Sequence, residues 1–255
     1  MTVAVWGPVQ AELTDLLADD PTDIAGVVDR LVAVQGLLDR LPPLSTENPV
    51  ADFNRLYTTI TKEVLARYGL GGFADPEFLN CLDVEFAKRY FNALRLWGSG
   101  SPDTPEAWMV LFRRCDDRRL RSLPCAVAGV NAHINYDLPF ALVSTWEQVG
   151  FQPGDSPQHQ DFLLINDVFF EAIPNLRHTY LDTWGRYIDR LNGGFDDWYQ
   201  NLLVELTRDI AWDRAVRLWL LRRDALAVEE ERVSFDHRTA LAGRVLLSPF
   251  MSRLQ

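Results

Sequence analysis

Four polar side chains stand in a stretch of sequence that is otherwise almost entirely apolar or small. Asn131, His133, Asn135 and Asp137 fall within seven residues of the segment 124–149. Burying one unpaired polar group costs about 1–3 kcal/mol, so four such groups in one apolar helix predict an organised polar site.

His133 and Asp137 are four residues apart, which places both side chains on one face of a helix, one turn from each other. In that arrangement both could bind one metal ion, or the carboxylate could fix the tautomer of the imidazole. The structural alternative is a hydrogen-bonded pair that ties this helix to its neighbours.

His159 and Asp161 form a second group, in the segment SPQHQDFLLINDVFF. They stand in the first turn of an expected helix, where the positive helix end disfavours imidazolium and keeps the ring able to bind a metal. Asn166 and Asp167 follow one to two turns later. The alternative for this group is a capped amphipathic helix with a polar edge.

Asp83 is a third candidate, because an acid on an apolar helix face should be paired. Its neighbours at three, four and seven positions are Leu79, Phe86, Ala87 and Tyr90. A salt bridge to Arg89 or Arg95 is the structural alternative to a role as acid or base.

The other two histidines have more polar surroundings. His178 and Asp182 repeat the four-residue spacing, but their flanks favour a surface pair. His237, in SFDHR, is interpreted as a neighbour of a helix cap.

These residues support a metal-dependent enzyme as the first hypothesis. The expected ligands are His133, Asp137, His159 and Asp161, and Asp83, Asn135 and Asp137 are the expected catalytic residues. Mixed imidazole and carboxylate ligands fit zinc, iron or manganese, and hydrolysis of an ester or phosphoester is the simplest reaction.

Two alternatives belong to other classes. One is a metal-free cyclase or isomerase of secondary metabolism, in which Asp137 or Asp83 moves a proton in a pocket lined by aromatic rings. The other is a protein that binds a small molecule without converting it. The eight tryptophans fit a lined cavity, although core packing explains most of them.

All three hypotheses need helices to position these side chains. Apolar residues recur at three- and four-residue steps, which predicts one all-α multi-helix bundle over residues 1–255, with N-terminal helices within 9–41. The expected later helices cover 50–68, 76–97, 105–118, 124–149, 157–170, 174–191, 195–223 and 233–246. Their start signals include Asp23 and the pair Asp75 and Pro76.

Pro139 should kink the central helix beside the polar cluster. A proline inside a helix removes one hydrogen bond and frees the carbonyl four residues earlier, here that of Asn135.

Composition narrows the partners. The net charge of -11 opposes wrapping of duplex nucleic acid. No apolar run approaches the roughly 20 residues that span a bilayer, and the N-terminus lacks the layout of a signal peptide, so we expect a cytoplasmic protein. The polar cluster leads us to expect a small-molecule substrate. Cys81, Cys115 and Cys125 are too far apart for a zinc ribbon or a disulfide framework, and we expect reduced thiols.

The segments GVNAHINYDLPFALV, NCLDVEFAKRYFNAL and SPQHQDFLLINDVF together resemble an uncharacterised family of bacterial helical proteins, a domain of unknown function with an NAHIN-x-DLP core. The likeness extends over about 53–247. It implies the fold and marks Asp83, His133, Asn135, Asp137, His159 and Asp161 as distinctive polar positions, without implying a reaction.

A second likeness is to zinc-dependent phospholipases C and single-strand nucleases, in which a helical His-x-x-x-Asp binds zinc. His133 and Asp137 resemble that element. Those enzymes also use an N-terminal tryptophan and more histidines than the four present here, so one or two metals are the most that the resemblance implies.

A geometric expectation unites these hypotheses. Ionisable groups are rarely buried without partners, so His133, Asp137, His159 and either Asp83 or Asp161 should converge in one cavity.

Overall fold

The structure is a computed structural model that describes part of the 255-residue chain. The described residues are 6, 7, 9–41, 48–114, 117, 120, 122–150, 153, 157–165, 167, 168, 171 and 208–248.

The described residues form an all-α bundle and contain no strand, as expected. The elements are α1 (Gln10–Leu16), α2 (Ile24–Leu38), α3 (Pro49–Gly69), α4 (Pro76–Gly98), α5 (Glu106–Phe112), α6 (Ser122–Ala132), η1 (His133–Asp137), α7 (Leu138–Val149), α11 (Arg208–Leu221) and α12 (Ala225–Leu246). Residues 157–165 are helical as well.

Local signals set the starts of the long N-terminal helices. The side chain of Asp23 accepts the backbone N–H of Gly26 at 2.7 Å, and that of Asp75 accepts the N–H of Phe78 at 3.0 Å. These oxygens satisfy N–H groups that have no partner within the first turn of a helix. The expected caps of α2 and α4 are therefore confirmed.

Other expected boundaries differ. Helix α2 ends at Leu38, before the expected residue 41, and α5 is shorter than expected at both ends. Helix α12 begins at Ala225 instead of 233, because Asp224 caps it by accepting the N–H groups of Leu226 and Ala227. The expected helix 174–191 and the first part of 195–223 lie outside the described residues.

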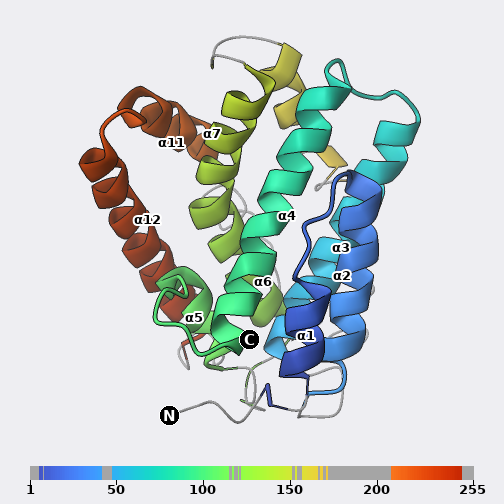
Figure 1. Cartoon of the computed structure of the whole chain (residues 1–255), viewed down its shortest axis with the longest axis vertical. Coiled ribbons are helices and arrows are strands. Elements are labelled where there is room, and N and C mark those ends of the chain that lie inside the picture. Colours follow the sequence, from blue (N-terminus) through green and yellow to red (C-terminus); the bar gives the residue numbers. More distant parts are fainter. Residues whose placement is uncertain are drawn as a thin grey trace, which may run out of the picture.

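Helix α4 runs through the middle of the bundle (Figure 1). Helices α1 to α3 lie on one side of it, and α7, α11 and α12 lie on the other. Helix α3 packs on α2 and α6, and α12 packs on α5 and α6. The main apolar core therefore includes residues from both ends of the described chain.

Helices α3 and α6 pack tightly at Gly129. A Cβ atom added there would lie 2.3 Å from Cγ of Phe53, which is 1% exposed. Only glycine permits this approach without displacing the Phe53 ring.

Elements α6, η1 and α7 form one continuous helical run interrupted by a π-helical turn, where the kink was expected. The backbone N–H of Leu138 donates to the carbonyl of His133, five residues earlier. Pro139 has no N–H to donate to Asn135, and the freed carbonyl accepts a hydrogen bond from Nη1 of Arg214 at 2.8 Å. The proline and an arginine of α11 therefore account for the interruption.

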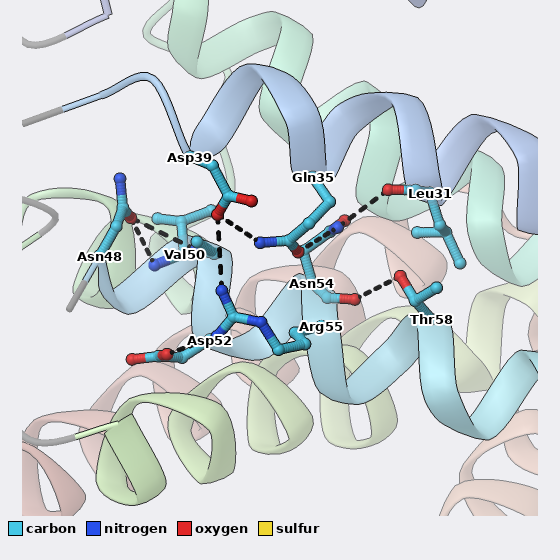
Figure 2. Close-up of polar contacts among 10 residues, drawn as sticks. Leu31, Gln35, Asp39, Asn48, Val50, Asp52, Asn54, Arg55 and Thr58 are labelled. Carbon is cyan, nitrogen blue, oxygen red and sulfur yellow. Dashed lines mark hydrogen bonds and ion pairs between the residues drawn. The ribbon is translucent and has the colours of Figure 1, made fainter. Parts of the chain in front are cut away.

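Polar contacts fix α2 on α3 (Figure 2). Nδ2 of Asn54 donates to the carbonyl of Leu31 at 3.0 Å and to Oε1 of Gln35 at 2.9 Å. Asp39 accepts from Gln35 at 2.8 Å and from Arg55 at 3.4 Å. Because Asn54 also accepts from the hydroxyl of Tyr90 at 3.3 Å, the same contacts reach α4.

Within the described part of the chain, no helix is both long and apolar enough to cross a membrane.

Candidate functional site

The two residues first singled out in the sequence are in direct contact. Nδ1 of His133 and Oδ2 of Asp137 lie 2.9 Å apart, within η1. The two residues are only 3% and 2% exposed. The polar pair therefore belongs to the interior of the bundle.

A tryptophan from α5 completes the contacts of the carboxylate. Nε1 of Trp108 donates to Oδ2 of Asp137 at 3.0 Å. Since the indole nitrogen can only donate, Oδ2 accepts this bond and also shares a proton with the imidazole of His133. Either the imidazole donates to a carboxylate, or a protonated carboxyl group donates to Nδ1.

The environment of Asp137 favours retention of a proton. Burial raises the pKa of Asp137 to about 8, although the charge of Arg89 and the hydrogen bond from Trp108 act in the opposite direction. A carboxyl group in hydrogen-bond contact with imidazole titrates together with it. Near neutral pH the carboxyl group of Asp137 therefore keeps a proton in most molecules, in contact with Nδ1 of His133.

Aromatic rings enclose His133. Its imidazole stacks on Phe86 with 3.5 Å between ring centroids and 6° between planes, and Tyr57 approaches edge-on at 4.6 Å. The rings farther from the imidazole belong to Phe53, Tyr90 and Trp108, with centroids 5.7 Å, 6.1 Å and 5.9 Å away. The proton of the pair is thus shielded from water by an apolar wall.

Arg89, on α4, carries the positive charge that lowers the pKa of Asp137. Its Nη2 donates to the carbonyl of Phe140 at 2.6 Å and to Oγ of Ser144 at 2.7 Å, both on α7. Burial lowers the pKa of Arg89, while the charges of Asp137 and Glu85 raise it. The sequence pattern suggests Arg89 only as a salt-bridge partner of Asp83.

Asp83 is half-buried on α4. Of its two suggested arginine partners, Arg89 makes the contacts with α7 described above, and Arg95 donates to Oδ1 of Asn92 at 2.6 Å.

Asn131 and Asn135 are bonded in a different direction from the pair. Nδ2 of Asn131 donates to the carbonyl of Thr239 on α12 at 2.9 Å, and Nδ2 of Asn135 donates to Oδ1 of Asn131 at 3.2 Å. Both the carbonyl and Oδ1 of Asn135 accept from Arg214 on α11. The four polar residues of the central helix thus divide into two groups, and Asn135 belongs to the group bonded toward α11 and α12.

Asp161 binds the start of α4. Its Oδ1 accepts the N–H of Ala74 at 2.8 Å, its Oδ2 accepts the N–H of Asp75 at 2.6 Å, and it is 1% exposed. His159 packs its ring on Trp212 with 4.4 Å between centroids.

The expected convergence of four metal ligands is not found. Among the described residues, no three His, Cys, Asp or Glu side chains are grouped so that they could hold a metal ion. The physical reason is visible at Asp161, whose two oxygens are already used by backbone N–H groups. The contact between His133 and Asp137 joins two of these candidates.

The remaining candidates lie at the surface or outside the description. Asp167 is exposed, and His237 lies within α12, with Nδ1 3.5 Å from Oε2 of Glu106. Asn166, His178 and Asp182 lie outside the described residues. Cys81 and Cys125 are free thiols, as expected, and Cys115 lies outside the description.

The sequence analysis missed a second buried acid, Asp52, which is 1% exposed. Burial raises the pKa of Asp52 to about 7, while a hydrogen bond with Ser122 and the nearby Arg55 lower it. Nη1 of Arg55 lies 3.2 Å from its Oδ1. Its position in the first turn of α3 could have drawn attention to it, but an acid there is ordinary at a helix start.

Comparisons with known proteins give one family and no activity. Residues 24–249 match the model of DUF5995, a family of unknown function. No curated protein and no solved structure matches the chain. The resemblance to a domain of unknown function is confirmed, with a match that begins before the expected residue 53, and nothing supports the likeness to phospholipases C.

Proposed function

Because the chain belongs to DUF5995, a family of unknown function, we propose a function from the site alone: an acid–base enzyme that shifts a proton within an apolar substrate. The observation that carries this proposal is the pair His133 and Asp137, joined at 2.9 Å and enclosed by aromatic rings. The π-helical turn that contains both residues adds support, since such turns occur frequently at functional sites.

The imidazole of His133 acts as the base and, once protonated, returns the same proton as the acid. In molecules whose Asp137 is ionised, Nδ1–H of His133 donates to the carboxylate. Nε2 of the ring then takes a proton from a carbon of the substrate, and the carboxylate stabilises the imidazolium that forms. The electron pair of the broken C–H bond moves into a new double bond, and the former double bond accepts the proton at another carbon. The reaction is an isomerisation that needs no oxidant or reductant.

The strength of the pair limits the substrate. An imidazole base removes protons only from activated carbons, such as those beside a carbonyl group. The aromatic wall favours an apolar body around that group. We therefore propose an unsaturated, largely hydrocarbon carbonyl compound as the substrate class.

Access to the pair involves its most exposed neighbours. Phe86 is 9% exposed and Tyr57 is 7% exposed, whereas Tyr90 and Trp108 are completely covered. Displacement of the Phe86 ring, which covers one face of His133, would place a substrate against the imidazole. The proposal therefore includes opening of the bundle beside α3 and α4.

No metal has a role in this proposal. The proposed step uses only His133 and Asp137, whose Nδ1 and Oδ2 atoms are bonded to each other, with Trp108 also donating to that oxygen. Hydrolysis of an ester or phosphoester with zinc, iron or manganese remains a separate hypothesis, for which metal analysis is the test.

The proposal is tested by isotope uptake with a mixture of apolar extract molecules as the probe. Protein without a histidine tag is incubated with the extract in deuterium oxide, and mass spectrometry follows compounds whose mass rises by one deuterium. We expect such uptake with the wild type and with His159→Phe, which alters the ring packed on Trp212. His133→Phe and Asp137→Asn should abolish it.

Folding of each variant is measured by circular dichroism. Equal loss of folding and uptake in both pair variants would favour the structural interpretation of the pair. Uptake unchanged in the folded His133→Phe protein would refute the proposed role of the imidazole.

A further inference from the structure

A pocket of about 600 Å³ opens between the N-terminal segment and α4. Leu17 and Ala18, which follow α1, line one side, and Phe91 lines the other. Its volume lies in the range of pockets that hold small molecules. Leu17 and Phe91 are 7% and 4% exposed and give the pocket an apolar wall.

The lining contains both signs of charge, but the acids already have a partner. Nζ of Lys88 lies 2.8 Å from Oε1 of Glu85 and 3.4 Å from Oδ2 of Asp20. Glu85 and Lys88 hold each other in their charged forms, since the pKa of Lys88 is raised chiefly by its hydrogen bond to Glu85. One lysine therefore satisfies both carboxylates of the lining.

The two arginines of the lining are bonded to neutral groups. Arg89 donates through Nη2 to the carbonyl of Phe140 and to Ser144, and its buried Nε has no hydrogen-bond partner in the described structure. Arg95 donates through Nη2 to the amide oxygen of Asn92. Guanidinium groups bind carboxylates strongly because parallel N–H groups match the two oxygens.

We propose that this pocket binds a small organic carboxylate. The anion lies at Arg89 and Arg95, and the apolar body packs on Leu17, Ala18 and Phe91. An excess of one positive charge in the lining selects the anion: three basic residues, Lys88, Arg89 and Arg95, stand against two acids, Asp20 and Glu85. This binding site is independent of the isomerase proposal.

The test uses three probes on the full chain. Benzoate combines a carboxylate with an apolar ring, benzamide has the same shape without charge, and inorganic phosphate has charge without an apolar body. Dissociation constants come from calorimetry. We expect saturable binding of benzoate, with benzamide and phosphate weaker by roughly ten- to a hundredfold, which is the worth of a charge-assisted hydrogen bond.

Variants locate the binding. Arg95→Gln and Arg89→Gln should each weaken benzoate by roughly ten- to a hundredfold. Arg217→Gln is the matched control, because Arg217 lies on α11 and pairs with Glu231. Arg95 is exposed, so its variant separates binding from folding if Arg89→Gln is unstable.

Three results would overturn the proposal. They are no saturable binding of benzoate, equal binding of benzoate and benzamide, and benzoate binding that survives in folded Arg95→Gln and Arg89→Gln proteins. Phosphate binding tighter than benzoate binding would also contradict the apolar part of the site.

Discussion

The two faces of the central helix provide hydrogen-bond partners for their buried polar side chains in different ways. On one face, Asn131 and Asn135 pair their amides with each other, with a backbone carbonyl of α12 and with Arg214. On the other face, His133 and Asp137 share a proton and face aromatic rings. Both arrangements satisfy buried polar groups, but only the second contains a group that changes its charge near neutral pH.

This contrast separates a polar group that holds helices together from one that could also do chemistry. An amide has a fixed set of donors and acceptors, so replacing it should change stability equally at every pH. An acid with a displaced pKa makes stability depend on pH. The two faces can therefore be told apart by stability, by its dependence on pH and by metal content.

The largest effect is expected for Asp137→Ala. The change leaves two buried groups, Nε1 of Trp108 and Nδ1 of His133, without the oxygen that now contacts them. An unsatisfied buried polar group costs about 1–3 kcal/mol, so the free energy of unfolding should fall by about 2–6 kcal/mol. Urea denaturation measures this fall, and a loss below about 1 kcal/mol would show that the contacts matter little to stability.

Asn131→Ala, on the other face, should cost less. It removes the hydrogen bond to the carbonyl of Thr239 and the one from Nδ2 of Asn135. The hydrogen bond from Arg214 on α11 to the carbonyl of Asn135 remains. We expect a loss of about 1–3 kcal/mol in the free energy of unfolding that is the same at pH 5 and pH 8. A loss that varied with pH would break the proposed contrast between the faces.

The dependence of stability on pH should show the buried acids directly. Asp137, with a pKa of about 8 in the folded chain, keeps a proton that the unfolded chain gives up near its ordinary value of 3.8. The folded state then binds more protons than the unfolded state, so stability falls as the pH rises from about 4 to 8 and levels off above that.

Comparison with Asp137→Asn isolates this contribution. Each proton contributes at most about 1.4 kcal/mol per pH unit to the slope. Asp52, with a pKa of about 7, gives a slope of the same sign that ends one unit lower. Between pH 7 and 8 the wild type should therefore lose stability faster than the Asp137→Asn protein, and parallel urea curves over this range would contradict the assignment.

The smallest expected effect concerns metal. Purified wild-type protein without a tag should contain zinc, iron and manganese in amounts well below one per chain, and His133→Phe should leave that content unchanged. Elemental analysis by mass spectrometry makes the measurement. One metal per chain that is lost in the His133→Phe protein would restore the metal-dependent hypothesis.

Features that depend on neighbours in the chain could be predicted from the sequence. The caps Asp23 and Asp75 were found because a cap and its N–H partner lie within one helical turn. The contact between His133 and Asp137 follows from their four-residue spacing on one helix. The freed carbonyl of Asn135 follows from Pro139, although the pattern does not reveal that Arg214 donates a hydrogen bond to it.

Features that depend on long-range packing could not be predicted. Nothing near Asp161 in the chain indicates that its oxygens bind the backbone of Ala74 and Asp75, which precede it by 87 and 86 residues. Trp108 likewise lies 29 residues before the carboxylate to which it donates. A histidine or acid within a pattern shows that a partner is needed, but the tertiary fold decides which partner it is.

The close approach at Gly129 also constrains how this protein can evolve. Any larger residue there would push against Phe53, whose ring contacts Trp108 and Tyr90 at the wall of the pair. A lineage could replace this glycine only after or together with a smaller residue at position 53. In an alignment of related sequences, positions 53 and 129 should therefore covary, because the two residues meet where two helices pack.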